Sequence, residues 1–362
     1  MNRRGFLWLF IFLFFIHTAF SQNGNEWINY SQTYFKIPVV EKGIYRIDYN
    51  TLSTALTSVG KDPSTFNPQN FQIYARGKEI PIYVFGEADG FLHPTDYIEF
   101  YAYPNDSWLD TAIYENPSDI PNPYFNLYND TIHYFLTWNN VTNNLRFSEY
   151  NNTSFPPSSS AVSYFLKTTV TQNSVNYNPG WLDANNKGEP TFTAGEGFVF
   201  PRIDGAGNSQ TFSLNTPNTA TGIVPSARLR TGVVSFSDPN DTNVPFDHHV
   251  TMSITNNVLV DESFNDQNFF SYDITFSASF LTNGTTSLTY TNQPDAASAT
   301  KTAPTYFEIT YPHKPDLAGE NIDGYELTLD NASSQNYLLL NNVTASAISA
   351  VYDLTDYYRI QP

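Results

Sequence analysis

Hydrophobic and polar residues alternate along much of this chain, and the alternation is clearest between positions 71 and 103. Residues 71–75, 80–85 and 97–103 carry β-branched and aromatic side chains at every second position, and Arg76-Gly77-Lys78 separates the first two runs. A period of two between turn-forming residues is typical of half-buried strands. The sequence therefore predicts three consecutive strands here.

The same pattern recurs on both sides of this stretch. Residues 34–40 and 44–49 predict two further strands, and residues 51–59 predict a short helix that Asn50 caps and Gly60 ends. After position 200, short strands are expected at even spacing, which favours an antiparallel sandwich or jelly-roll: 210–214, 226–235, 249–255, 258–261, 268–276, 285–291 and 306–311. Strands are also expected at 325–329, 337–340 and 348–352.

Composition supports an all-β protein with two antiparallel β-domains. The chain holds 29 Phe and 25 Tyr, which fit pleated surfaces, and no segment after the N-terminus keeps a helical period. A Pro- and Ser-rich break at 155–160 suggests a boundary. The expected organisation is a signal peptide (1–21), an N-terminal β-domain (22–150), a linker with extended β-segments (151–200), a β-sandwich (201–315), and strands leading toward a further domain (316–362).

The first residues have the features of an export signal. Arg3 and Arg4 precede an apolar run at 6–16, and Ala19-Phe20-Ser21 resembles a cleavage site. A membrane anchor is the alternative, but this run is short of the about 20 residues that a spanning helix needs. Cleavage before Gln22 is therefore predicted, with no transmembrane segment left afterwards. The protein is expected to be exported to the cell surface, the outer membrane or the medium.

Charge and cysteine content exclude several classes of function. The formal net charge is −18 and no cluster of Lys and Arg is present, so nucleic acid is not an expected partner. The chain has no cysteine, which excludes disulfides, a thiol nucleophile and thiolate metal sites within these residues.

A series of short segments resembles the N-terminal region of the gingipain family of cysteine peptidases, above all the type IX secretion sortases of Bacteroidetes. Each segment is short, but their order is consistent across the chain. They are GIYRI (43–47), QIYARG (72–77), IPIYV (80–84), ADG (88–90) followed by DYIEFY (96–101), NPY (122–124) and HYFLT (133–137).

This resemblance implies a secreted, multidomain protein in which a peptidase domain with a catalytic His and Cys follows these β-domains. Since the chain has no Cys, no catalytic residue can be assigned within it. Only the resemblance to this family indicates that the chain is part of an enzyme. The implied role is to fold, shield or dock the peptidase. Its implied partners are the downstream peptidase domain of the same polypeptide and outer-membrane type IX secretion components. The alternative is a secreted binding module or adhesin that recognises glycans or cell-surface proteins.

An acidic loop is the candidate metal site. Glu87, Asp89, Asp96 and Glu99 surround Gly90, and Ca²⁺ takes six to eight oxygen ligands from such loops. No other cofactor is expected. The spacing is not that of an EF-hand, and a solvated acidic turn without metal is the alternative interpretation.

Two other groups could carry chemistry. His248 and His249 follow Asp247, but adjacent strand residues point to opposite faces, so the two rings cannot share one ion. Hydrogen-bonded histidines at a strand start are expected instead. A second group could stack on sugars or pack as core: Tyr83, Tyr97, Tyr101, Tyr103 and Trp108. An exposed apolar surface is expected near positions 337–358.

Overall fold

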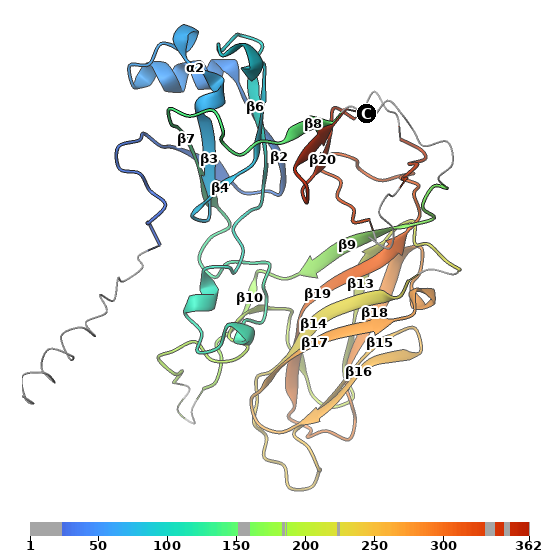
Figure 1. The fold of residues 1–362 in the computed structure, drawn as a ribbon. Helices are drawn as coiled ribbons and strands as arrows, with labels where there is room; N and C mark the ends of the chain where they lie inside the picture. Colours follow the sequence, from blue (N-terminus) through green and yellow to red (C-terminus); the bar gives the residue numbers. More distant parts are fainter. Residues whose placement is uncertain are drawn as a thin grey trace, which may run out of the picture. The chain divides into compact units, whose positions relative to one another are not determined.

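The computed structural model describes residues 24–150, 160–182, 185, 187–222, 225–329, 337–343 and 348–361. The expected export signal at 1–21 lies outside these ranges, as does most of the Pro- and Ser-rich break. The described chain is nearly all β, as predicted, with one α-helix and several antiparallel sheets (Figure 1). None of its described helices is long and apolar enough to cross a membrane.

The chain divides into two compact units that interleave along the sequence. The first comprises the stretch up to Pro38, Tyr45–Phe100 and His133–Phe147, and the second comprises Val39–Ile44, Tyr101–Ile132 and Ser148–Pro362. Short 3₁₀ helices punctuate the connections in both: η1 (Pro63–Thr65), η2 (Pro68–Asn70), η3 (Glu87–Asp89), η4 (Asp110–Ala112), η5 (Pro117–Asp119) and η6 (Ala278–Phe280).

The first unit is built on two small sheets. One has the order β1 (Phe35–Val39), β7 (Ile132–Trp138), β3 (Phe71–Ala75) and β4 (Lys78–Ile80). The other has the order β2 (Gly43–Asp48), β6 (Tyr97–Ala102) and β5 (Ile82–Phe85).

The strand predicted at 80–85 is divided between these sheets. Arg76 and Gly77, at φ 51° and 77°, close the expected hairpin between β3 and β4. β4 then ends at Ile80, and β5 begins at Ile82 in the second sheet. Pro81 lies between them, and its lack of an N–H prevents it from continuing the ladder.

The core of the first unit is rich in aromatic side chains. Helix α2 (Tyr49–Ser58) buries Leu52 and Leu56 one turn apart. It begins earlier than predicted, because Asp48 rather than Asn50 caps it and accepts a bond from Thr51 N at 2.8 Å. Between the sheets, Phe100 of β6 and Tyr134 of β7 have ring centroids 5.7 Å apart.

The second unit contains a two-sheet sandwich, which matches the predicted class (Figure 1). One sheet has the order β12 (Ile203–Asp204), β19 (Lys301–His313), β14 (Ala227–Ser235) and β17 (Phe269–Phe276), with β9 (Phe165–Gln172) also paired to β19. The facing sheet has the order β13 (Ser209–Thr216), β18 (Gly284–Asn292), β15 (His248–Ile254) and β16 (Asn257–Phe264).

Side chains from both sheets meet in one core. Leu229 and Ile309 come from the first sheet, and Met252 and Leu288 from the second, and all four are at most 1% exposed. β19 extends well beyond the predicted 306–311, because it is the strand against which β9, β12 and β14 all pair.

The rest of the second unit forms two smaller sheets. β10 (Asn176–Asn178) pairs with β11 (Gly197–Val199), and β8 (Ser148–Tyr150) pairs in parallel with β21 (Tyr358–Ile360), which pairs with β20 (Val351–Asp353). The strands predicted at 325–329 and 337–340 are absent from the described chain. Instead, residue 328 forms an isolated β-bridge, in which Thr328 pairs with Leu166 of β9.

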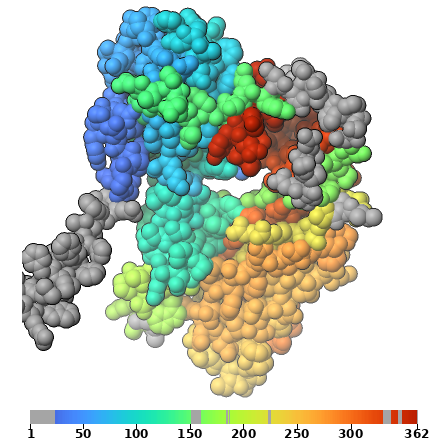
Figure 2. Space-filling view, viewed as in Figure 1, coloured from blue at the N-terminus to red at the C-terminus, as the bar shows by residue number. Residues whose placement is uncertain are grey.

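The C-terminal part of the described chain exposes apolar side chains, as predicted. The C-terminal residues, coloured red in Figure 2, lie at the surface. Leu339, Val351, Leu354, Tyr357 and Tyr358 are each 38–51% exposed.

Candidate metal centre

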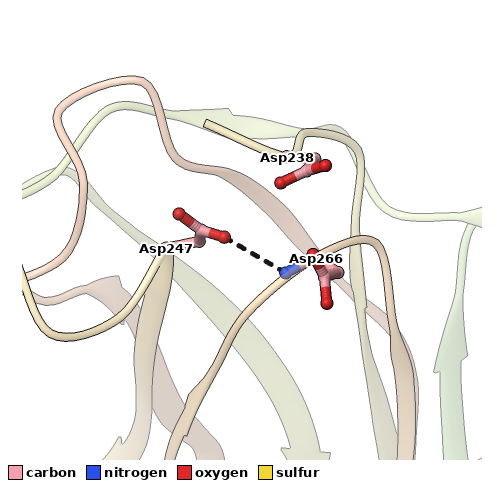
Figure 3. Close-up of side chains that lie close together, drawn as sticks. All are labelled: Asp238, Asp247 and Asp266. Atoms are coloured by element: carbon pink, nitrogen blue, oxygen red, sulfur yellow. Dashed lines mark hydrogen bonds between the residues drawn. The ribbon is translucent and has the colours of Figure 1, made fainter. Parts of the chain in front are cut away.

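Three aspartates from two connections converge at one end of the sandwich (Figure 3). Asp238 follows β14, Asp247 directly precedes β15, and Asp266 lies in the connection between β16 and β17. One carboxylate oxygen from each lies within 4.8 Å of the others. Antiparallel strands bring such connections to the same end of a sheet, which is how residues distant in sequence come together.

Backbone hydrogen bonds position Asp247 against the turn that carries Asp266. Asp266 adopts a left-handed φ of 63°, and its N–H donates to Asp247 Oδ2 at 3.2 Å. In return, the Asp247 N–H donates to Asn265 Oδ1 at 2.9 Å. Asp247 is thereby 6% exposed, whereas the other two aspartates face solvent.

Two polar side chains fix the remaining parts of the site. The Asn240 amide donates to Asp238 Oδ1 at 2.6 Å. The Ser235 hydroxyl accepts from Asn268 N at 2.7 Å and donates to Asp266 O at 3.1 Å, which ties the turn to the end of β14. These hydrogen bonds hold in place the two connections that carry the three aspartates.

This arrangement can offer three hard oxygen ligands to a cation. Ca²⁺ needs six to eight, so backbone carbonyls and water would have to supply the rest. In the part of the chain that the structure describes, none of the three is ion-paired. Without a cation, the three negative charges repel one another.

His248, next to Asp247, is engaged elsewhere. Its ring is fully buried, with Nε2 2.9 Å from Ser237 O and Nδ1 2.7 Å from Thr300 Oγ1. A carbonyl can only accept, so Nε2 donates and Nδ1 accepts from the hydroxyl. Burial lowers the pKa of His248, which favours this neutral form. Both nitrogens are used, so His248 offers no ligand.

His249 points to the opposite face, as the strand period predicts. Its ring nitrogens lie 2.8 Å from Asp261 Oδ1 and 2.7 Å from Asp295 Oδ1. Burial alone would lower the pKa of His249, but the hydrogen bonds to the two carboxylates outweigh it and raise the pKa. His249 therefore links three segments of the sandwich and takes no part in a site with His248.

The four acids of the predicted calcium loop have separate partners. Glu87 pairs with Arg146 at 2.9 Å, and Glu99 pairs with Arg46 at 2.5 Å. Burial raises the pKa of Glu87, and Arg146 opposes that shift.

The other two acids of that loop bind its own residues. Asp89 Oδ2 lies 3.0 Å from His93 Nε2, and Asp89 Oδ1 accepts from Phe91 N at 3.0 Å. Asp96 accepts from His93 N at 2.8 Å. Among the described residues, metal-ligand spacing is met by the aspartates at 238, 247 and 266 and not by this loop. Calcium binding by the loop stays a prediction, which a calorimetric titration tests.

Arg146 organises the first unit around this loop. Besides Glu87, its guanidinium donates to four main-chain carbonyls, at 2.9–3.5 Å, and the side chain is only 16% exposed. These carbonyls belong to Pro68, Gln69, Phe71 and Leu145. The fork of five N–H groups makes this possible, and a lysine could not reproduce it.

Four of the five aromatic residues considered as a sugar platform, all of them tyrosines, contact other aromatic rings. In the first unit, Tyr97 stacks on Phe85 at 5.0 Å, and the Arg46 guanidinium lies 4.0 Å from the Tyr97 ring centroid. In the second unit, Tyr101 and Tyr103 contact edge to face at 4.7 Å. The ring centroids of Tyr83 and Tyr97 lie 6.2 Å apart. Trp108, the fifth residue of the group, lies in the second unit.

The sequence contained one signal for the aspartate group. Asp238-Pro239-Asn240 and Asn265-Asp266 are turn-forming runs that end predicted strands. Only the strand order shows that these turns share one end of the sandwich.

No family model and no curated protein matches the chain. Among solved structures, dimeric latent PorU from Porphyromonas gingivalis is similar over 79% of this chain and 25% of that one, at 12% identity and a TM-score of 0.45. The chain thus spans about a quarter of that structure's length.

Carbohydrate-active proteins are also similar, at a TM-score of 0.23. The CBM36-1 domain of a multidomain xylanase, from the hindgut metagenome of Trinervitermes trinervoides, is 11% identical over 40% of this chain and 96% of that one. The β-porphyranase BpGH86A from Bacteroides plebeius is 10% identical over 81% of this chain and 35% of that one. No functional conclusion rests on these likenesses.

Proposed function

We propose that this chain is the non-catalytic N-terminal region of an exported gingipain-like cysteine peptidase of the type IX secretion sortase kind. Its β-units would fold ahead of the peptidase domain and then shield or dock it. The site of action is the cell surface or the outer membrane. The downstream domain is the main partner, and secretion components of the outer membrane are further partners.

The observation that carries the proposal is where the family-like segments lie. GIYRI, QIYARG, IPIYV, DYIEFY and HYFLT coincide with β2, β3, β5, β6 and β7. These are five of the seven strands that form the two sheets of the first unit. Five of the seven segments therefore follow one structural framework in order, while ADG and NPY lie in connections.

The sheet of β8, β20 and β21 is the proposed contact for the downstream domain. Tyr150, Val351 and Tyr358 are 40–46% exposed on it, and the two tyrosine rings lie 5.6 Å apart. Exposed apolar groups of this kind mark surfaces that another domain covers.

A binding experiment tests the proposal. The chain without residues 1–21 is mixed with the separately produced product of the downstream reading frame, and the dissociation constant is measured by calorimetry. Replacing Val351 and Tyr358 with serine together is expected to weaken binding by at least about tenfold, through loss of buried apolar area. The control is Val258→Ser on β16, which is 58% exposed in the sandwich and is expected to change nothing.

Two results would contradict the proposal. One is a downstream frame that encodes no domain with a catalytic His and Cys. The other is affinity that is the same in the double variant and in the control. The chain alone is also expected to cleave no Arg, Lys or generic peptide substrate above background, since a thiolate nucleophile is missing.

A further inference from the structure

Strand β17 forms one edge of the sandwich. In the described chain the first sheet ends at β17, which pairs with β14 over its whole length without a register shift (Figure 1). Just before β17, Ser235 N donates to Asn268 O at 3.0 Å, and hydrogen-bonded pairs recur at every second residue of an antiparallel ladder. The main-chain groups that face β14 therefore belong to residues 270, 272, 274 and 276. Those that face away belong to residues 269, 271, 273 and 275.

The sandwich core is incompletely covered at this edge. Phe270, Tyr272 and Ile274 pack against the core from β17, but all three stay partly exposed. The core-facing side chains of the edge strands in the other sheet are only 0–7% exposed: Phe212 and Leu214 on β13, Val260 and Phe264 on β16. A further strand beside β17 would remove apolar area of these three side chains from water.

The edge strands of the other sheet carry features that discourage pairing with another chain, and β17 does not. β16 pairs with β15 through an irregular register. On β13, the Asn215 carbonyl accepts from Thr169 Oγ1 of β9 at 2.9 Å. β17 contains no Pro, Gly or Lys, and its one charged residue, Asp273, has Oδ1 2.6 Å from Arg228 Nε. A regular edge without such protection is a place where a strand of another chain can add.

The outward main-chain groups of β17 match those of a second β17 strand. When two such strands run antiparallel with Tyr272 opposite Tyr272, every residue with outward groups lies opposite another residue of that kind. Residue 271 then faces residue 273, and residue 269 faces residue 275. Centring the pair on Ser271 instead would shorten the bonded stretch.

The side chains favour the same register. On the core side, Phe270 lies opposite Ile274 of the second copy, so apolar groups meet apolar groups. On the other side, Ser271 lies opposite Asp273, and no two like charges face each other. Centring the pair on Asp273 would place two carboxylates directly opposite, which is destabilising.

We infer that β17 is a self-association edge, through which two copies of this chain pair in antiparallel fashion about Tyr272. The five-stranded sheets of the two copies then form one continuous sheet. Each copy offers the same surface, as a two-fold symmetric interface requires. Phe270, Tyr272 and Ile274 of one copy lie beside those of the other, which covers the open side of both cores.

Analytical ultracentrifugation of the chain without residues 1–21 tests the pairing. Between about 1 and about 300 μM, a reversible monomer–dimer equilibrium is expected, with a micromolar dissociation constant because an edge contact is small. Ser271→Pro removes an outward N–H, leaves the β14 ladder intact and puts its ring where the second strand would lie. Dimerisation is expected to be lost in this variant. Ser271→Ala keeps the N–H and is the matched control, which should dimerise as the wild type does.

Charge at position 271 tests the register. Ser271 is exposed, so its replacement should leave the fold intact, which circular dichroism checks. Ser271→Lys would face Asp273 of the second copy and is expected to lower the dissociation constant about fivefold. Ser271→Asp would face the same carboxylate and is expected to raise the dissociation constant about fivefold.

Three results would overturn the inference. The first is a chain that stays monomeric over the whole concentration range. The second is a dimer that Ser271→Pro and Ser271→Asp leave unchanged, because the copies would then associate elsewhere. The third is an equal effect of Ser271→Lys and Ser271→Asp, which would exclude the register about Tyr272. If Ser271→Pro fails to fold, the two charge variants decide.

Discussion

Two threonines on paired strands of the sandwich are equally buried, but only one has a hydrogen-bond partner. Thr231 of β14 and Thr305 of β19 are both 0% exposed. The Thr231 hydroxyl donates to Tyr306 O at 2.6 Å. The Thr305 hydroxyl has no partner among the described residues. Valine has the shape of threonine, so Thr→Val at each position changes the polar group and little else.

The expected effects have opposite signs. A buried polar group without a partner costs about 1–3 kcal/mol, so Thr305→Val removes a penalty and is expected to stabilise the sandwich by about 1 kcal/mol. Thr231→Val removes a bond and leaves the Tyr306 carbonyl with one donor fewer, so it is expected to destabilise by about 1–2 kcal/mol. The two variants should therefore differ by about 2–3 kcal/mol.

Urea unfolding followed by circular dichroism measures this difference. The slope with denaturant should be the same in both variants, so that a shift in midpoint reports stability alone. The reasoning would be refuted if both midpoints fell by the same amount, because the polar partner would then make no difference.

Three further predictions concern packing and charge. Arg146→Lys is expected to lower the free energy of unfolding of the first unit by about 3 kcal/mol, measured with urea, because lysine cannot reach the carbonyls and leaves Glu87 poorly paired. A decrease of less than about 0.5 kcal/mol would contradict this. Gly232→Ala is expected to cost about 1–3 kcal/mol in the same assay, since the new Cβ would lie 2.7 Å from the Phe269 ring, 2.8 Å from Thr305 Oγ1 and 3.0 Å from the Phe270 carbonyl oxygen; unchanged stability would show that these neighbours move aside at no cost. Asp238→Asn, measured with a chelator at low salt, is expected to gain about 1 kcal/mol by removing one of three like charges; a gain that persists at high salt would exclude repulsion as its cause.

Local patterns predicted the strands well because alternation and turn chemistry are local properties. The hairpin at Arg76-Gly77 and the sandwich strands from β13 to β18 follow from them. The failures have local causes too. Pro81 divides a strand that hydrophobicity alone would continue, and Asp48 caps a helix that Asn50 was expected to cap.

Such local patterns could not predict which distant segments of the chain contact one another. Residues 325–329 have the alternation of a strand, but in the structure they make one bridge to β9. Lys167 fixes them, because its ammonium group lies over the Tyr325 ring and donates to Glu326 O, and a sequence period does not predict those contacts.

Two acidic groups of this chain differ in how far neighbouring basic residues neutralise them. Acidic side chains outnumber basic ones by 35 to 17 in this chain. Arg146 and Arg46, distant in sequence from the loop at 87–99, neutralise Glu87 and Glu99 there. The aspartates at 238, 247 and 266 are scattered in sequence, yet the strand order gathers them with no basic residue among them. Two of the four acids in the loop are thus ion-paired with arginine, whereas the dispersed aspartates bring three negative charges close together, and a cation bound there would relieve their repulsion.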